Sequence, residues 1–174
     1  MKKAIILISG GMDSCVTASC AKKDGFDLYF LHINYAQRTE KRELESFNEI
    51  ADFFNVKKKL VINMDHFSNI GGSCLTDLNI PVPRGNLENH QIPISYVPFR
   101  NANILSAATS WAEIINATSI HIGAVEEDSS GYPDCRRSFY DAFEETIKQG
   151  TKPDTSIKII TPLISLKKNE IVSL

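Results

Sequence analysis

Residues 3–9, which contain an unbroken run of isoleucine and leucine at 5–8, set the fold class of this chain. Because apolar side chains would occupy both faces of such a strand, the run predicts a parallel strand buried on both sides. A helical pattern follows it directly, and a second apolar run spans residues 27–34. Parallel strands need crossover connections between them, so the beginning of the chain indicates an α/β fold.

The alternation of strand and helix continues along the chain. Residues 39–54 place apolar side chains at helical spacing on one face and predict a helix. The other predicted elements are strands at 59–62, 119–123 and 157–161 and helices at 101–115 and 138–148. This order predicts a doubly wound, mainly parallel five-stranded sheet of the Rossmann-like type. With 174 residues, of which 43% are hydrophobic, we expect one domain over residues 1–174.

Charge and the amino-terminal segment narrow the class of partner. The formal net charge is -2, which gives no attraction to polyanions, so the composition favours neither nucleic acid nor a membrane surface. A small-molecule substrate fits better. The short apolar run after Met1 is too brief for a signal sequence or a membrane span. We therefore expect a cytoplasmic protein.

Two segments fall outside the regular alternation. Residues 64–95 are rich in Gly, Pro and Asn, and we interpret them as a lid loop that covers the substrate. The last residues predict a helix capped by Ser165. Because the chain stops within this helix, the natural protein is expected to continue beyond Leu174.

The segment between the first strand and the first helix carries the clearest chemical signal, which is Ser9-Gly10-Gly11-Met12-Asp13-Ser14. Free backbone N–H groups and the positive end of a helix dipole at such a position form an anion site. The two glycines let the backbone approach a phosphate, and both serines can donate hydroxyl hydrogen bonds. Asp13 would need a cation between itself and a phosphate, so we assign it to Mg²⁺ or to helix capping. The segment is neither a Walker A loop nor a G-x-G-x-x-G fingerprint. The alternative is a tight turn with ordinary caps.

The pattern S-G-G-x-D-S after a first strand resembles the pyrophosphatase loop of the PP-loop synthetases, which include GMP synthetase, NAD synthetase and tRNA-modifying enzymes. This resemblance implies an adenine nucleotide α-hydrolase-like fold and the splitting of ATP between its α and β phosphates. It implies that ATP is bound by residues 8–14, namely Ile8, Ser9, Gly10, Gly11, Met12, Asp13 and Ser14. Ser9, Asp13 and Ser14 are the expected catalytic members.

Further segments are similar to the 7-cyano-7-deazaguanine synthase (QueC) family. They are Tyr96-Val97-Pro98-Phe99-Arg100-Asn101, the stretch from Gly123 to Arg136, Asn34-Tyr35-Ala36-Gln37-Arg38, and parts of the 64–95 segment. The resemblance covers the whole chain. Each segment follows a predicted strand or opens a helix, where doubly wound sheets bind ligands.

The resemblance suggests roles for individual residues. Arg38, Arg100, Asn101 and Gly123 join the expected nucleotide site, with Arg100 also catalytic and preferred over Arg38. On the substrate side, the expected residues are Asp128 and Asp134 for the edge of the base, Tyr132 for stacking, and Arg136 for a carboxylate or phosphate. The alternatives are surface salt bridges for the arginines, and a plain turn with a solvated charge run for residues 126–134.

The reaction that the family resemblance implies is the ATP-dependent conversion of 7-carboxy-7-deazaguanine and ammonia to 7-cyano-7-deazaguanine, by way of an amide. Mg²⁺ and a homodimer are also implied. The family carries a four-cysteine Zn²⁺ cluster near its C-terminus, and the ligands of that cluster are absent from this chain. Loss of a structural zinc site would remove folding free energy.

The chain's own cysteines and histidines show no metal-ligand spacing. We interpret the scattered cysteines as reduced thiols: Cys15, Cys20, Cys74 and Cys135. Cys135 invites a role as nucleophile, but no histidine lies nearby in sequence, and we expect it only to line the site. His32 and His121 lie in apolar strands and are expected to be core or pocket-wall groups.

Two other functions remain open from the sequence. One is another AMP-forming PP-loop enzyme, such as a tRNA thiolase or a subunit of an amidotransferase, although the acidic net charge argues against an RNA-binding surface. The other is a catalytically silent module that binds ATP without cleaving it. Turnover, rather than affinity, separates these functions.

Overall fold

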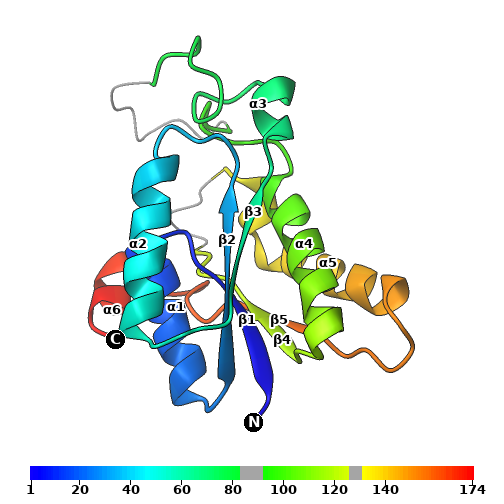
Figure 1. Ribbon diagram of the computed structural model, residues 1–174. Helices are drawn as coiled ribbons and strands as arrows, with labels where there is room; N and C mark the ends of the chain where they lie inside the picture. The colour runs from blue at the N-terminus through cyan, green and yellow to red at the C-terminus, as the bar shows by residue number, and fades with distance from the viewer. Residues whose placement is uncertain (83–91, 126–130) are drawn as a thin grey trace.

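The computed structural model describes residues 1–82, 92–125 and 131–174 (Figure 1). The elements, in chain order, are β1 (Lys3–Leu7), α1 (Met12–Lys23), β2 (Asp27–Asn34), α2 (Glu40–Phe53), β3 (Lys59–Asn63), α3 (His66–Ile70), α4 (Arg100–Ile115), β4 (Ser119–His121), the 3₁₀ turn η1 (Pro133–Cys135), α5 (Arg137–Gly150), β5 (Lys158–Ile160) and α6 (Lys168–Val172). Every predicted strand and helix is present, and the boundaries differ by at most a few residues.

The sheet has the order β3-β2-β1-β4-β5, and all four strand pairs are parallel. Strand β1 lies at the centre, where Ile6 pairs with Phe30 on one side and with His121 on the other. The prediction of a doubly wound, five-stranded sheet is confirmed. The strand order reverses at β1, and in such sheets ligands bind beyond the carboxyl ends of the strands at that reversal.

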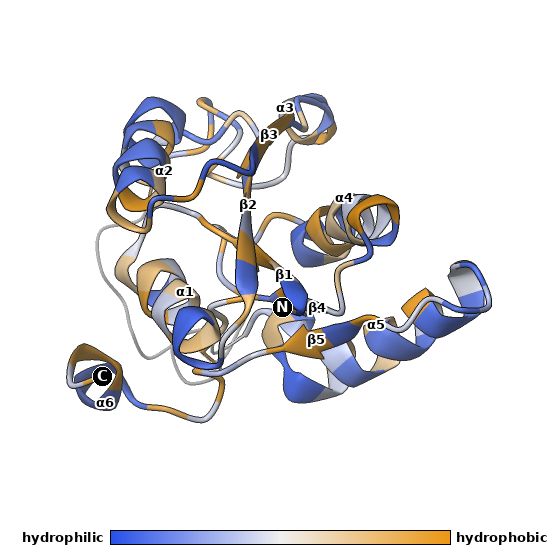
Figure 2. Cartoon of the chain, turned by 60° about the horizontal axis from the view of Figure 1, so that its bottom comes forward, coloured by the Kyte–Doolittle hydropathy of each residue, from blue (hydrophilic) through white to orange (hydrophobic). Residues whose placement is uncertain are grey.

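Helices cover both faces of the sheet, which explains why β1 has no polar face (Figure 2). Ala4 and Ile6 pack with Phe47 under α1 and α2, whereas Ile5 packs with Leu105 under α4. Each face buries a separate apolar cluster. A strand that is apolar on both sides can be buried only in such a three-layer arrangement.

The structure differs from the sequence prediction at two places. The 64–95 segment begins with a short helix, α3, which the Gly-rich and Pro-rich composition concealed; residues 83–91 lie outside the described residues. The prediction that Ser165 caps the last helix is wrong, because α6 begins at Lys168. Its first turn is closed by the Glu170 side chain, which accepts a hydrogen bond from the Lys167 N–H at 2.7 Å. Within the described part of the chain, the helices are all too short or too polar to cross a membrane.

Candidate active site

The loop between β1 and α1 is held open by glycine and tied by its own serines. Gly10 has φ +90°, and a Cβ there would lie 2.7 Å from the carbonyl oxygen of Glu43. The Gly11 N–H donates to Ser9 Oγ at 3.3 Å, and Ser14 Oγ donates to the Gly11 carbonyl at 2.7 Å. This loop leads directly into the N-terminus of α1, where the helix dipole and free N–H groups favour an anion.

Asp13 lies in the first turn of α1 and forms an ion pair with a residue that the sequence did not single out. Lys168 Nζ from α6 donates to both carboxylate oxygens of Asp13 at 2.9 Å. The two residues are 155 positions apart in sequence, so no local pattern could reveal the contact. The pair places one positive and one negative side chain at the edge of the phosphate loop.

Gly123 follows β4 and lies against the first turn of α1. A Cβ at this position would lie 2.9 Å from the Asp13 carbonyl carbon and oxygen and 3.0 Å from Thr17 Oγ1. Contacts this short are not tolerated against backbone, so the close approach of these two segments requires a glycine. Because it lacks a side chain, Gly123 allows the segment after β4 to contact α1 directly and to line the cavity there.

The opposite wall of the site begins at the N-terminus of α4 with Arg100. Its guanidinium lies over the Tyr35 ring, with 5.1 Å between the guanidinium carbon and the ring centroid, and Nη1 donates to Tyr35 Oη at 3.0 Å. Burial raises the pKa of the Tyr35 hydroxyl, and the Arg100 charge opposes that shift. For Arg100 itself, burial lowers the pKa, but nearby tyrosines and Asp134 outweigh burial and leave the pKa raised. Arg100 is therefore a permanent cation.

The turn η1 anchors the start of α4. The Asn101 N–H donates to Asp134 Oδ2 at 2.9 Å, and the Asn101 side-chain amide donates to the Asp134 carbonyl at 2.9 Å and to Cys135 Sγ at 3.2 Å. Asp134 is buried, with 3% of its surface exposed. Its carboxylate thus satisfies a backbone donor at a helix N-terminus, which is the role of a capping residue.

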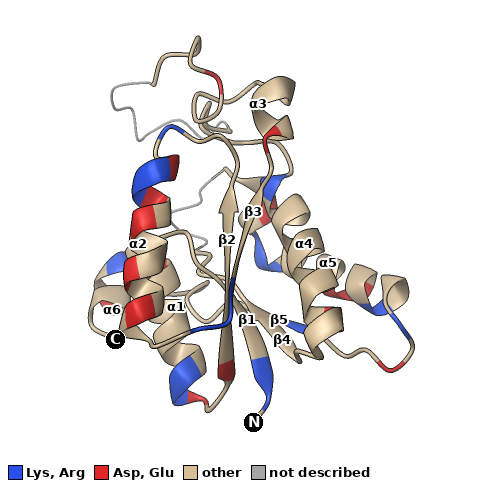
Figure 3. Ribbon diagram, viewed as in Figure 1, with Lys and Arg blue, Asp and Glu red and all other residues tan. Residues whose placement is uncertain are grey.

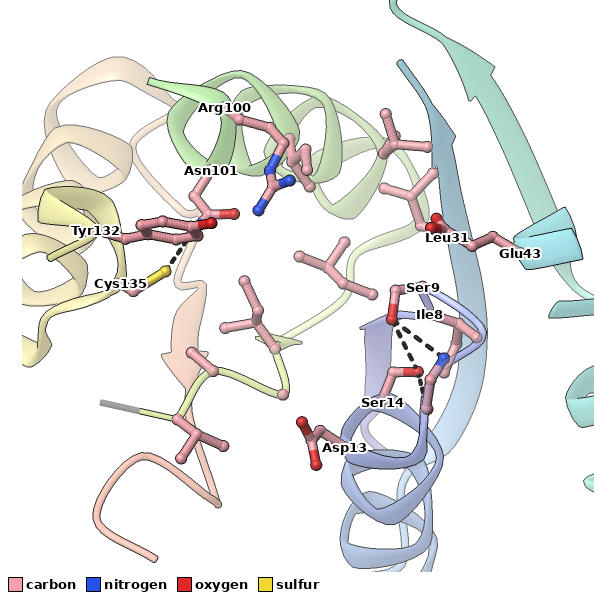
Figure 4. A pocket seen from close by; sticks show the side chains of 18 of the residues that line it. Ile8, Ser9, Asp13, Ser14, Leu31, Glu43, Arg100, Asn101, Tyr132 and Cys135 are labelled. Carbon is pink, nitrogen blue, oxygen red and sulfur yellow. Dashed lines mark hydrogen bonds between the residues drawn. The ribbon is translucent and has the colours of Figure 1, made fainter. Parts of the chain in front are cut away.

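The two walls enclose one cavity of about 320 Å³ (Figure 4). Its volume lies at the lower end of the range for small-molecule sites. Nine of the residues expected in the site line this cavity: Ile8, Ser9, Gly11, Asp13, Ser14, Arg100, Asn101, Gly123 and Tyr132. Cys135 also lines it, as expected. Asp128 lies outside the described residues.

Several expected site residues lie elsewhere. Arg38 is directed away from the cavity, because its guanidinium donates to the carbonyls of Cys74, Asp77 and Ile80 at 2.8–3.1 Å. It fastens the 64–95 segment to the end of β2. Asp134 caps α4 instead of lining the cavity, and Arg136 is exposed at the start of α5. Gly10 and Met12 belong to the phosphate loop but do not line the cavity, and Met12 is 41% exposed.

The cavity also contains residues that the sequence analysis missed. Glu43 from α2 lies at the phosphate-loop side, where Gln37 Nε2 and Thr39 Oγ1 donate to its carboxylate. Tyr35 and Tyr140 complete the aromatic wall, and burial strongly raises the pKa of Tyr140. Tyr35 belongs to the family-like segment 34–38, in which the charged Arg38 was the predicted site residue. Glu43 and Tyr140 lie within amphipathic helices, where nothing local distinguishes them from surface and core positions.

Both strand histidines are buried core groups, as expected. His32 is fully buried, stacks on Phe47, and has ring nitrogens 2.7 Å from the Ile8 carbonyl and 3.0 Å from Asn34 Oδ1. Burial lowers the pKa of His121 to about 4. Neither histidine lines the cavity.

The amino-acid sequence matches a known protein family over nearly its whole length. The family described as "Queuosine biosynthesis protein QueC" matches residues 3–174. The chain belongs to the QueC family. Within that family it is similar to the 7-cyano-7-deazaguanine synthase of Chloroherpeton thalassium, with 61% identity over 98% of this chain and 75% of the relative. The enzyme of the same name from Chlorobium chlorochromatii is 60% identical over the same shares. A QueC family member is an ATP-dependent enzyme of queuosine biosynthesis.

Solved structures of more distant proteins support the fold assignment. A protein from Methanocaldococcus jannaschii described as a predicted subunit of a tRNA methyltransferase superposes with a TM-score of 0.63 at 18% identity, over 99% of this chain and 73% of that one. The NH₃-dependent NAD synthetase of Campylobacter jejuni superposes with a TM-score of 0.54 at 15% identity, over 98% and 61%. At these identities the likeness concerns the PP-loop α/β fold and not the substrate.

Proposed function

We propose that this chain converts 7-carboxy-7-deazaguanine and ammonia to 7-cyano-7-deazaguanine with two molecules of ATP. The observation that carries the proposal is that a phosphate loop and an arginine–aromatic wall face each other across one cavity. An AMP-forming synthetase needs both sites in contact, because the substrate oxygen must reach the α-phosphate. Relatives that are about 60% identical to this chain over 75% of their own length are named 7-cyano-7-deazaguanine synthases.

The nucleotide end is the loop from Ser9 to Ser14. Its serine hydroxyls already exchange hydrogen bonds with loop atoms, as when Ser14 Oγ donates to the Gly11 carbonyl. On binding ATP, the same hydroxyls and the free N–H groups at the start of α1 would donate to the β- and γ-phosphates. These donors stabilise the charge that develops on pyrophosphate as it leaves.

The chemistry proceeds in two activations at the same carbon. In the first, a carboxylate oxygen attacks the α-phosphate of ATP, pyrophosphate leaves, and ammonia then displaces AMP to give the primary amide with loss of a proton. In the second, the amide oxygen attacks the α-phosphate of another ATP and pyrophosphate again leaves; loss of AMP and of both protons from the nitrogen then gives the nitrile. Each oxygen departs on AMP, so no water is released, and water must be excluded from the activated intermediates.

The substrate end is the wall formed by Tyr132, Asn101 and Cys135. The Tyr132 ring projects into the cavity and offers a face on which a planar deazapurine can stack (Figure 4). Ser95 and Tyr132 share a hydrogen bond of 2.7 Å between their hydroxyls, which ties the end of the 64–95 segment to this wall. That contact supports a role for the segment as a cover over the bound substrate.

The chain's residues fit Mg²⁺ at the nucleotide end. Mg²⁺ is commonly held by one or two carboxylates together with substrate phosphates, and Asp13 supplies one carboxylate beside the phosphate loop. When bound, Mg²⁺ would neutralise charge on the leaving pyrophosphate. Asp13 would exchange its contact with Lys168 for that role, and Lys168 would then be released toward the phosphates.

The four cysteines do not fit a zinc site. Cys15 and Cys20 lie on α1, whereas Cys74 and Cys135 are buried in separate segments, and none of the four forms a disulfide within the described residues. Among the described residues, no three His, Cys, Asp or Glu side chains gather as a metal site would require.

We propose that the enzyme works in the cytoplasm as a homodimer and acts on small molecules, without a nucleic-acid or membrane partner. The Lys and Arg positions are spread over several elements of the ribbon in Figure 3, which supports this view because nucleic-acid sites gather basic residues on one surface.

The test is turnover. The chain is incubated with ATP, Mg²⁺, ammonia and 7-carboxy-7-deazaguanine, and the products are followed by mass spectrometry. We expect AMP, pyrophosphate and the nitrile, with the amide appearing transiently. If ATP binds but neither AMP nor amide forms, the proposal is overturned in favour of a silent ATP-binding module.

A further inference from the structure

Arg100 is the one arginine from the family-like segments that lines the cavity among the described residues. Arg38 is held by three carbonyl oxygens of the 64–95 segment, and Arg136 is exposed at the start of α5. Within the described residues, planar, bidentate recognition of an anion by an arginine in this cavity therefore falls to Arg100.

The described residues leave most of the guanidinium N–H donors of Arg100 available. A guanidinium has five N–H donors. Among the described residues, Arg100 uses one of them, because Nη1 donates to Tyr35 Oη. No carboxylate in the described part of the chain forms an ion pair with it. The nearby Asp134 carboxylate accepts a hydrogen bond from the Asn101 N–H instead. A partly buried cation in this state favours an anionic ligand.

The position of Arg100 indicates which anion this is. Figure 4 shows its guanidinium extending into the cavity from α4, on the side of Tyr132 and Cys135, with Ser9 and Ser14 on the opposite side. The phosphates of ATP already have an anion site at the N-terminus of α1. Arg100 instead lies beside the aromatic ring that suits the flat base of the second substrate.

We propose that Arg100 binds the carboxylate of the deazapurine substrate and thereby selects for the first of the two activations. The inference rests on the function proposed above. The primary amide that enters the second activation carries no charge, so it gains little from a fixed guanidinium. Arg100 is thus a specificity-determining residue for the acid, while the phosphate loop serves both activations equally.

The experiment compares two substrates for one enzyme. Arg100→Gln and Arg100→Lys are assayed by kcat/KM, once with the carboxylate plus ammonia and once with the primary amide, both at saturating ATP and Mg²⁺. We expect Arg100→Gln to lose about 100-fold with the carboxylate, as for a lost charge-assisted bidentate contact, and less than about threefold with the amide. Arg100→Lys, which keeps the charge but not the fork, should fall between wild type and Arg100→Gln with the carboxylate.

Equal losses with both substrates would overturn the inference and assign Arg100 to the nucleotide. Arg42→Gln is the matched control, because Arg42 lies on the outer face of α2 with a 71% exposed side chain and should change neither value. Tyr35→Phe removes the hydroxyl that orients Arg100 and should lower only the carboxylate value, by less than Arg100→Gln does.

A separate measurement distinguishes failure of the proposed function from failure of the inference about Arg100. If the wild-type chain converts neither substrate, the proposed function fails. Equilibrium binding of the carboxylate and of the amide, measured by calorimetry without ATP, then tests Arg100 on its own. Preferential binding of the carboxylate that Arg100→Gln abolishes would support the inference, and equal binding by wild type and variant would overturn it.

Discussion

The two walls of the cavity are built in different ways. The phosphate wall is six consecutive residues, Ser9–Ser14, whose useful groups are backbone N–H groups and short hydroxyls on a tight turn. The opposite wall gathers Tyr35, Arg100 and Tyr132, which come from three distant segments and act through long side chains. A site made of consecutive backbone groups tolerates little change in backbone conformation. A site made of side chains from distant segments can lose one side chain and keep its shape. We expect the first wall to serve any activation by ATP and the second to set the substrate.

The largest effect should follow Gly10→Ala in the phosphate wall. The new Cβ would meet the Glu43 carbonyl at 2.7 Å and force alanine into φ +90°. Left-handed strain together with overpacking lowers the free energy of unfolding by about 3 kcal/mol, and turnover falls for both substrates. Urea unfolding and kcat/KM measure the two losses.

Gly25→Ala is the matched control for that change. Gly25 has φ +80° but no atom within 4 Å of an added Cβ, so it reports the conformational strain without the clash. We expect a loss of about 1 kcal/mol and normal turnover. Equal losses in the two variants would show that the contact with Glu43 does not constrain the loop.

Asp13→Asn should give the next largest effect. Removing this carboxylate from the phosphate wall should lower kcat/KM about 100-fold, or about 2.7 kcal/mol, and equally for the carboxylate and the amide. Lys168→Met removes the partner of Asp13, and because this ion pair is partly exposed it should change stability by less than about 1 kcal/mol. A loss confined to one substrate would contradict the division of labour between the walls.

The same contrast explains how much of the site the sequence could predict. Ser9–Ser14 was recognisable because a strand, a turn and a helix in direct succession fix its geometry locally. The doubly wound sheet was likewise predictable, since apolar runs of strand length alternate with helical patterns. For these features, neighbours in sequence are neighbours in space.

The second wall could be predicted only in part. Arg100 and Tyr132 were expected in the site and line the cavity, but Asp134 was expected to bind substrate and instead caps α4. A carboxylate near the start of a helix can either bind substrate or cap the helix. Which role it takes depends on the residue that it contacts in the folded chain, which the sequence does not reveal. Lys168 was missed for the same reason, because its contact with Asp13 spans most of the chain.

Asp134→Ala tests the capping role and should have an intermediate effect. Loss of the acceptor leaves the buried Asn101 N–H unsatisfied and lowers the free energy of unfolding by about 2 kcal/mol. Asp134→Asn keeps an oxygen acceptor and should lose less. Urea unfolding gives both values. If stability stays unchanged while KM for the deazapurine rises, the residue binds substrate after all.

Arg38→Gln should have the smallest effect and the most local one. Its guanidinium joins the end of β2 to three carbonyls between Cys74 and Ile80, so its loss loosens the 64–95 segment without touching the cavity. Because Arg38 is exposed, these hydrogen bonds contribute about 1 kcal/mol. We expect faster cleavage of this segment by limited proteolysis, together with unchanged affinity for ATP. Arg42→Gln should alter neither measurement, and weakened ATP binding by Arg38→Gln alone would return Arg38 to the nucleotide site.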